Sequence, residues 1–238
     1  MKRAQLMGLA LAGVLALGAG APAVALATQG FTGGGMAATV QANEDWQRSG
    51  TCLWRITDGL LEVKPANGAN GILDGFGWKG RAAEITSVRV LPGVTAVASC
   101  YGMFEGCSSL KTADLTGLDT SSVRTMGSMF KDCSSLVSVV FGGIDTSSVQ
   151  SMSSMFNGCE ALTSLDLSGF DTTEVSSMDR MFYYCEALES LDLSGFKTGL
   201  VETMNGMFGH CKSLSSLDIT GLDLRDATDL EFMFIGCT

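Results

Sequence analysis

One stretch decides the fold of this chain: residues 149–170, VQSMSSMFNGCEALTSLDLSGF. The chain repeats this pattern at a fixed interval of 26 residues, without insertion or deletion. A Met-Phe pair marks the centre of each copy, and a cysteine follows three residues after each Phe. These cysteines are Cys107, Cys133, Cys159, Cys185, Cys211 and Cys237. Self-similarity at a period between about 20 and 50 residues indicates a repeat architecture, in which each copy is one coil of a stack.

Each copy has two halves with different periodicity. In residues 149–159 the apolar side chains fall at relative positions 0, 3, 6, 7 and 10, which fits one face of a short helix. The second half has a period of 2, with Leu165 and Leu167 inward and Asp166 outward, as in a short strand. An Asp-Thr pair then offers a side-chain oxygen that can cap the next helix. The sequence therefore predicts an α/β leucine-rich-repeat solenoid with one short strand and one short helix per 26-residue coil.

The segment before the repeats has the features of an exported protein. Residues 1–27 are typical of a signal peptide, with a basic start, an apolar core and a small-x-small site ending at Ala27. We favour cleavage there over an uncleaved anchor. Residues 28–49 are rich in Gly and Ala and predict a flexible leader. No later segment is long and apolar enough to cross a bilayer, so we expect a secreted or cell-surface protein without a transmembrane segment in the mature chain.

Residues 50–83 predict a small N-terminal β cap. Apolar residues alternate on both sides of Asp58-Gly59, a dipeptide that suits the tight turn of a hairpin. Such a hairpin would shield the apolar end of the solenoid, which we assign to residues 84–238. The last coil stops after its first half, so we expect the natural protein to continue past Thr238. The tryptophans of the cap can either pack its interior or line a glycan site, and we favour packing.

The repeats resemble a known family. Residues 152–175, MSSMFNGCEALTSLDLSGFDTTEV, are similar to the units of the BspA-like leucine-rich-repeat surface proteins of bacteria. The opening segment Gly50-Thr51-Cys52-Leu53-Trp54 also resembles that family, and the likeness covers residues 50–238. The resemblance implies a secreted or wall-attached protein that adheres to host or neighbouring cells. It supplies no catalytic residues.

Eight cysteines in an exported chain can form disulfides or remain buried thiols. Six of them occupy equivalent positions, and pairing neighbouring coils would give alternate coils different geometry. Because free cysteine is among the most buried residue types, we favour thiols for those six. A bridge between Cys52 and Cys100 stays open. Zinc sites need close ligand pairs such as C-x-x-C, which the sequence lacks.

The outward aspartates of the strands form the most regular polar feature: Asp114, Asp166, Asp192 and Asp218. Such a row can bind Ca²⁺ or a cationic protein, or it can be a solvated ladder that discourages aggregation, and we favour the ladder. Three substitutions break the pattern. Val140 replaces a strand Asp, Lys197 replaces a turn Asp, and Cys100 stands where later coils have Met. A strictly periodic array of ligands is therefore not expected.

We expect a partner to bind the outward side chains of successive strands, which are carboxylates and hydroxyls. These are Ser164, Asp166, Ser168, Ser190, Asp192, Ser194, Ser216, Asp218 and Thr220. Host or bacterial surface proteins or glycans are the expected partners, and binding should be sensitive to salt. The net charge of −10 and the lack of a basic patch argue against nucleic acid.

No constellation of residues predicts catalysis. His210 is the only histidine, and it lies next to Cys211, so the two side chains point in different directions. The glycine runs lack the Lys-Ser/Thr of a phosphate loop. We therefore predict a binding protein rather than an enzyme, with no cofactor and no metal. The alternatives are a structural spacer that displays another domain, or the binding portion of a larger surface enzyme.

Overall fold

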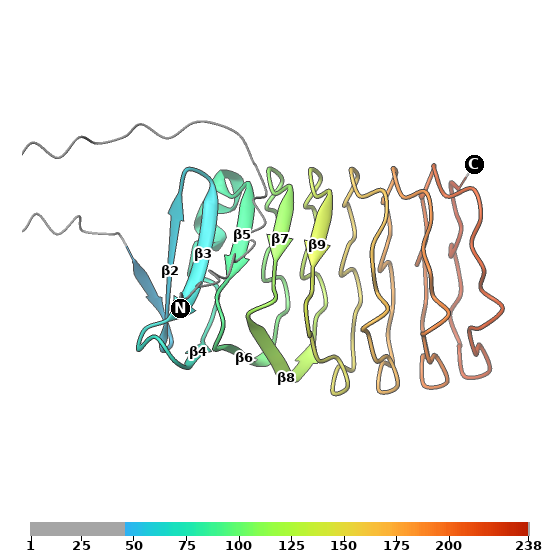
Figure 1. The fold of residues 1–238 in the computed structure, drawn as a ribbon. Helices are drawn as coiled ribbons and strands as arrows, with labels where there is room; N and C mark the ends of the chain where they lie inside the picture. Colours follow the sequence, from blue (N-terminus) through green and yellow to red (C-terminus); the bar gives the residue numbers. More distant parts are fainter. Residues whose placement is uncertain (1–45, 238) are drawn as a thin grey trace, which may run out of the picture. The chain divides into compact units, whose positions relative to one another are not determined.

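The computed structural model describes residues 46–237 as coils that stack side by side in sequence order (Figure 1). The expected signal peptide and residues 28–45 of the expected leader lie outside the described residues. The described part opens with β1, Gln47–Ser49, which pairs antiparallel with the next strand. Residues 47–49, which we assigned to the leader, form this strand.

Two sheets run along the first coils. One has the strand order β1-β2-β3-β5-β7-β9, and the other has the order β4-β6-β8. Their remaining strands are β2 (Cys52–Thr57), β3 (Leu60–Pro65), β4 (Gly71–Leu73), β5 (Ser87–Val90), β6 (Val94–Ser99), β7 (Thr112–Asp114), β8 (Leu118–Thr125) and β9 (Ser138–Val140). All pairs after β3 in the first sheet, and all pairs in the second, are parallel, as stacked coils require. The stack is thus a β-solenoid.

The predicted hairpin is present as β2 and β3. Thr57 pairs with Leu60, and the two residues between them have positive φ, 49° at Asp58 and 82° at Gly59. A type I′ turn has positive φ at both central positions. The hairpin joins the stack because β3 pairs with β5 in parallel. The segment between β3 and β5 contains β4 and a 3₁₀ helix, η1 (Gly77–Glu84).

The predicted helix of each coil is wrong. Residues 126–133 form two successive turns, in which the N–H of Met129 donates to the Met126 carbonyl and that of Cys133 to the Phe130 carbonyl. The third residue of each turn is left-handed, with φ of 54° at Ser128 and 60° at Asp132. An α-helix would need i to i−4 bonds and negative φ throughout. The same two positions are left-handed in the other coils.

The apolar pattern did not distinguish these turns from a helix, because both geometries bring positions 0, 3, 6, 7 and 10 to one side. The signal that does distinguish them is glycine. Five of the twelve left-handed positions carry it: Gly102, Gly106, Gly158, Gly206 and Gly236. Glycine adopts positive φ without steric cost but weakens a helix. A helix of about two turns is also marginal without strong packing.

The turns join neighbouring coils through a ladder of backbone hydrogen bonds, which we call the turn ladder. In one coil, the N–H groups of residues 126, 128, 130 and 132 donate to carbonyls 151, 153, 155 and 157 of the next coil, at 2.7–3.0 Å. The same four bonds recur from residue 100, from residue 152, from residue 178 and from residue 204. Every donor points toward the later coil. At the opposite end, the indole N–H of Trp78 donates to the Met103 carbonyl at 2.9 Å and takes the place of an earlier coil.

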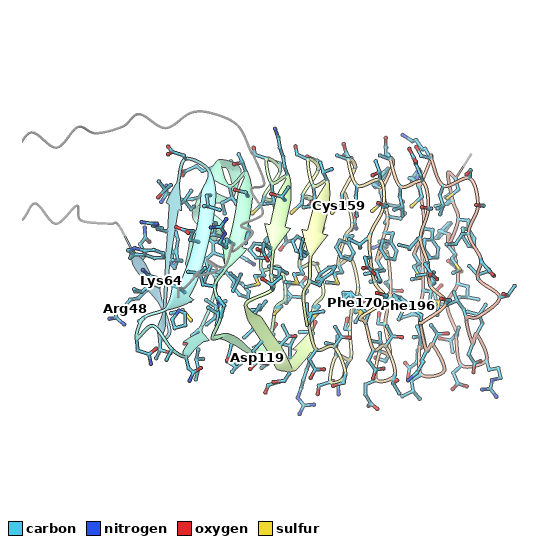
Figure 2. All side chains as sticks on the ribbon, viewed as in Figure 1. Arg48, Lys64, Asp119, Cys159, Phe170 and Phe196 are labelled. Carbon is cyan, nitrogen blue, oxygen red and sulfur yellow. The ribbon has the colours of Figure 1, made fainter. Side chains whose placement is uncertain are left out.

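The interior is built from columns of identical side chains, and buried residues such as Cys159 and Phe170 fill it along its length (Figure 2). Phenylalanine rings stack between coils with centroids 5.3–5.7 Å apart, from Phe104 to Phe234, and Trp78 precedes them at 6.1 Å.

Beside these rings, the thiol of Cys159 donates to the Phe130 carbonyl of the preceding coil at 3.2 Å. Four other cysteines make the equivalent bond. All eight cysteines are free. The prediction of buried thiols is confirmed for five of the six ladder positions, and Cys237 is half-buried.

Buried threonines form a third column that sequence reasoning missed. The hydroxyl of Thr172 donates to the carbonyl of Lys197 in the next coil at 3.0 Å and accepts that residue's N–H at 2.8 Å. Thr120, Thr146 and Thr198 make the same pair of bonds. The adjacent aspartate does the capping that we expected of the Asp-Thr pair. For example, Asp171 accepts the N–H of Thr173 at 3.0 Å, although this caps a turn rather than a helix.

The left-handed positions give a stability prediction. Ser154 has φ of 58°, where the equivalent residue of a later coil is Gly206. Because a side chain costs about 1 kcal/mol in this conformation, Ser154→Gly should raise the free energy of unfolding by up to about 1 kcal/mol. Ser122→Gly in β8, at a residue without positive φ, should lower it by about 0.5–1 kcal/mol. Urea denaturation measures both. Destabilisation by both variants would contradict the turn geometry.

The thiol column gives a pH prediction. Burial raises the pKa of Cys211 from the ordinary 9.0 to about 12, and it also raises that of Cys159 well above 9.0. The stabilising contribution of Cys159 and Cys211 is therefore complete below about pH 9 and is lost as the pH rises toward the native pKa, because only the unfolded thiol ionises there. Each of these two thiols should lower the free energy of unfolding by about 1.4 kcal/mol per pH unit above about pH 9.

Denaturation of the wild type and of Cys159→Ala at pH 8 and pH 10 tests this. The variant should be less stable at pH 8 and should lose less stability on going to pH 10, by an amount that corresponds to about one proton. The other titrating groups are the same in both proteins and cancel in the comparison. Equal losses in the two proteins would show that Cys159 is not a buried thiol.

Candidate interaction surface

The candidate partner-binding residues continue the face that begins with β5, β7 and β9. We call this face, with its equivalents in the later coils, the strand face. All nine predicted residues are exposed, from Ser164 to Thr220. The residues between them turn inward: Leu167 and Leu193 are buried, and Leu165, Leu191, Leu217 and Ile219 are half-buried against the core. The predicted alternation is therefore confirmed, and the nine side chains lie on one side of three consecutive coils.

The strand predicted in every coil is not formed on this face beyond β9. In the described part of the chain, no backbone hydrogen bond joins residues 164–170 to residues 138–144. The coils beyond β9 are held instead by the turn ladder and by isolated bridges, such as that between Ser151 and Ser177. The strand face is consequently the more loosely bonded side of the later coils.

Each strand-face aspartate is held by the backbone two residues ahead. The Oδ1 atoms of Asp166, Asp192 and Asp218 accept N–H bonds of 2.9–3.0 Å from Ser168, Ser194 and Thr220. Hydrogen bonds from the hydroxyls of these residues, which are the larger cause for Asp166 and Asp218, and from their backbone N–H groups, the larger cause for Asp192, lower the pKa of each carboxyl below its ordinary value of 3.8. The three carboxylates are thus ionised at neutral pH and oriented by their own turns.

The acidic row is shorter than the sequence pattern suggested. The strand register places Arg89 beside Asp114, and Val140 on the other side of Asp114. Val140 is 53% exposed and separates Asp114 from the later aspartates. The acidic part of the strand face is therefore limited to Asp166, Asp192 and Asp218.

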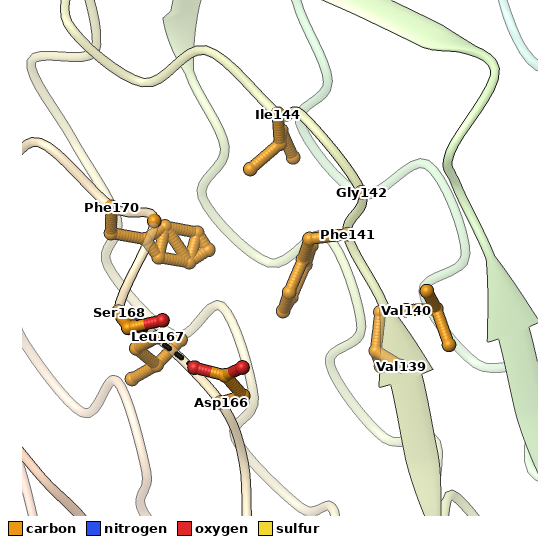
Figure 3. Close-up of a pocket in the computed structure, with 10 residues that line it drawn as sticks. Val139, Val140, Phe141, Gly142, Ile144, Asp166, Leu167, Ser168 and Phe170 are labelled. Carbon is orange, nitrogen blue, oxygen red and sulfur yellow. Dashed lines mark hydrogen bonds between the residues drawn. The ribbon is translucent and has the colours of Figure 1, made fainter.

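Two grooves open on this face where the strand pairing is absent. The first groove has a volume of about 390 Å³ and lies beside Val140 (Figure 3). It is lined by Val139, Val140, Phe141, Gly142, Ile144 and residues 166–170. The second groove, of about 190 Å³, is lined by residues 191–194, Asp218, Thr220, Gly221 and Leu222. Both grooves include residues of the predicted surface.

The apolar lining of the first groove was missed by sequence reasoning. Phe141 and Phe170 meet edge to face inside it, with ring centroids 4.9 Å apart. A signal for this groove exists in the sequence. Val140 interrupts the Asp row at the coil where the groove opens, which we had taken only as a break in periodicity.

The aromatic cap offers little surface for a glycan. Trp54 is 2% exposed and Trp78 is fully buried, and the two rings meet at 6.0 Å. Trp46 is half-buried and lies beneath the cationic groups of Arg55 and Lys64, at 4.5 and 3.8 Å from its ring centroid. These contacts bear out the packing interpretation of Trp54 and Trp78.

The remaining candidate groups, which are Cys52, Cys100 and His210, make structural contacts. Cys52 and Cys100 are both buried and unpaired, so the bridge left open by the sequence is not formed. The His210 ring stacks on Tyr184 at 4.5 Å and meets the Tyr183 ring edge to face at 5.3 Å. Among residues 46–237, no three His, Cys, Asp or Glu side chains are grouped so that they could hold a metal ion. No helix of the described part is long and apolar enough to cross a membrane.

Together, the fold and its polar face define a β-solenoid of 26-residue coils with an open, acidic side. Residues 96–216 and 138–238 match the family described as "Mycoplasma protein of unknown function, DUF285". The two matches span more than half of the chain, so it belongs to the DUF285 family.

A comparison with solved structures finds a leucine-rich repeat protein from Eubacterium ventriosum. The two share 18% sequence identity with a TM-score of 0.34, over 75% of this chain and 59% of that one. This chain thus spans little more than half the length of that neighbour. No curated protein matches the chain.

Proposed function

We propose that this chain is an exported cell-surface interaction protein that adheres to host or neighbouring-cell macromolecules through its strand face. One observation carries the proposal. Nine hydroxyl and carboxylate side chains are exposed on the same side of three consecutive coils, beside two grooves. Such a surface provides many weak polar contacts, whose sum over several coils gives affinity.

The residue pattern supports a place among BspA-like leucine-rich-repeat surface proteins. Residues 152–175 resemble the repeats of that family, and the inward Leu pattern is that of a leucine-rich repeat. In this chain, two turns stand where the helix of such a repeat was expected. We also propose that the hairpin β2–β3 acts as a cap, because it covers the edge of β5 and is followed by Trp78, which occupies the free end of the turn ladder.

Export rests on the sequence of residues 1–27, with cleavage after Ala27 as the expected event. We propose a secreted or cell-surface location for the mature chain, and surface proteins or glycans as partners. The excess of acidic groups favours basic partners and gives salt-sensitive association.

Two other roles fit the same fold. A structural spacer would display another domain and bind nothing itself, and the binding portion of a larger surface enzyme would act with a catalytic domain elsewhere. We propose a binding role rather than catalysis by this chain, because the groups discussed above are structural: buried thiols, a stacked histidine and threonines bonded between coils. Binding by the isolated coils separates adhesion from the spacer role.

The test is a binding array of host matrix proteins, bacterial surface proteins and glycans, probed with the mature chain. Changing Asp166, Asp192 and Asp218 together to Asn should weaken binding to the recognised partner by about tenfold, since exposed ion pairs contribute roughly 0.2–1 kcal/mol each. Asn keeps the oxygen that accepts the turn N–H, so the melting temperature should not change. Wild-type binding should persist until the pH falls below 3.8, because the folded-state pKa of each carboxyl is lowered.

The control is the matched change of Asp119, Asp145 and Asp171 to Asn. These aspartates cap the turns at another corner of the coil, so the charge is altered equally but away from the strand face. This control variant should change the affinity by no more than about twofold, because salt screens exposed charges that lie far from the bound partner. If both triple variants lose affinity equally, net charge rather than the strand face determines binding.

A further inference from the structure

We propose that the first groove is an anchor site for an apolar side chain in an extended, cationic polypeptide segment of the partner. The proposal rests on the proposed function and specifies its partner. It assigns the segment an aliphatic or aromatic residue that enters beside Val140, and a nearby lysine or arginine that reaches the carboxylates of Asp166 to Asp218.

The groove has the size and lining for such an anchor. Its volume of about 390 Å³ lies within the range of roughly 300–1,000 Å³ found for small-molecule sites. Phe141 and Phe170 are more than nine-tenths buried and present an aromatic wall, while Val140 at the rim remains 53% exposed. Asp166 closes the polar side, its carboxylate oriented by the bond to Ser168 (Figure 3). Apolar pockets rimmed by polar groups are where interface affinity is concentrated.

The sequence irregularity and the groove coincide. At the position of Val140, four other coils of the strand face carry Asp: Asp114, Asp166, Asp192 and Asp218. The second groove shows the regular arrangement, with Asp192 and Asp218 both in its lining. The first groove therefore suits an apolar group and the second a cation. A partner segment that occupies both grooves should therefore carry an apolar residue at one end and a basic residue at the other.

The spacing of the grooves determines the spacing in the partner. The first groove lies between the coils of Val140 and Leu167, and the second between those of Asp192 and Asp218. Their centres are two coils apart, which is on the order of 10 Å. An extended chain covers that distance in about three residues. The apolar and basic residues of the segment should thus be two to four positions apart.

Charge complementarity selects a cationic polypeptide among the possible occupants. The three carboxylates are ionised, they are exposed, and the chain as a whole has a net charge of −10. A neutral glycan would satisfy the hydroxyls but leave the apolar wall and the carboxylates unused. A lipid chain would fill the groove without using the carboxylates.

Two synthetic peptides test this on the mature chain. One has the sequence Gly-Ser-Phe-Gly-Ser-Lys-Gly-Lys-Gly, and the other has Ala in place of Phe. Methyl NMR signals of Val139, Val140 and Ile144 report occupancy of the groove. The Phe peptide should bind about tenfold more tightly than the Ala peptide and shift these methyl signals. That ratio corresponds to about 1.4 kcal/mol.

The variant Val140→Asp tests the anchor site most directly. It places at this exposed position the Asp that other coils carry there. It should abolish the preference for the Phe peptide while keeping or strengthening the binding of the Ala peptide. Val137→Asp, at another exposed valine outside the groove lining, is the control and should keep the preference. Equal binding of the two peptides to the wild type would overturn the anchor site. So would a shift of the same methyl signals by a neutral oligosaccharide or a short alkyl chain but by neither peptide.

The same variants separate this inference from the proposed function. If the partner found on the array needs Asp166, Asp192 and Asp218 but tolerates Val140→Asp, the strand face binds and the anchor site is wrong. If that partner tolerates loss of all three carboxylates, the proposed function itself fails.

Discussion

The structure depends on a ladder of backbone hydrogen bonds that all point the same way. In the turn segments, each N–H donor faces the later coil and each acceptor faces the earlier one, from Cys100 to Ile235. The peptide dipoles are therefore aligned head to tail along the stack, as they are along a helix axis. Within the described residues, the carbonyls of the first coil have no earlier coil to donate to them. The indole N–H of Trp78 donates to one of these carbonyls, that of Met103.

This constraint explains the strict period of 26 residues. A bond from Phe130 to the Met155 carbonyl fixes the length of the intervening loop, as do the stacked rings of Phe130 and Phe156. The thiol of Cys159 and the hydroxyl of Thr146 add bonds in the same register. An inserted residue would break all four kinds of contact at once, and would leave buried polar groups unpaired at a cost of about 1–3 kcal/mol each.

The strand face is under a weaker constraint, and this is where the coils differ. No ladder joins Val140 to the coil of Asp166, so side chains there can change without disturbing the register of the stack. The exchange of Asp for Val at position 140 exposes an apolar rim and coincides with the first groove. The turn side therefore fixes the register of the stack, and the strand side can change its side chains from coil to coil.

Much of this organisation is predictable from the sequence, and the exceptions have physical reasons. The period, the buried Met, Phe and Cys columns and the hairpin at Asp58-Gly59 follow from spacing and turn chemistry. The helix does not, because its apolar positions coincide with those of two consecutive turns, and the decisive left-handed residues include serine, arginine and tyrosine as well as glycine. The grooves depend on where strand pairing stops, which no single residue encodes.

The central claim is that the Met-Phe segments bond to the next coil and not within a helix. Scalar couplings across hydrogen bonds, measured by NMR on isotope-labelled protein, identify the acceptor of each amide directly. We predict a coupling between the amide nitrogen of Phe130 and the carbonyl carbon of Met155, 2.8 Å away from nitrogen to oxygen. A coupling from Phe130 to the carbonyl carbon of Met126, four residues earlier, would instead show an α-helix and contradict the account.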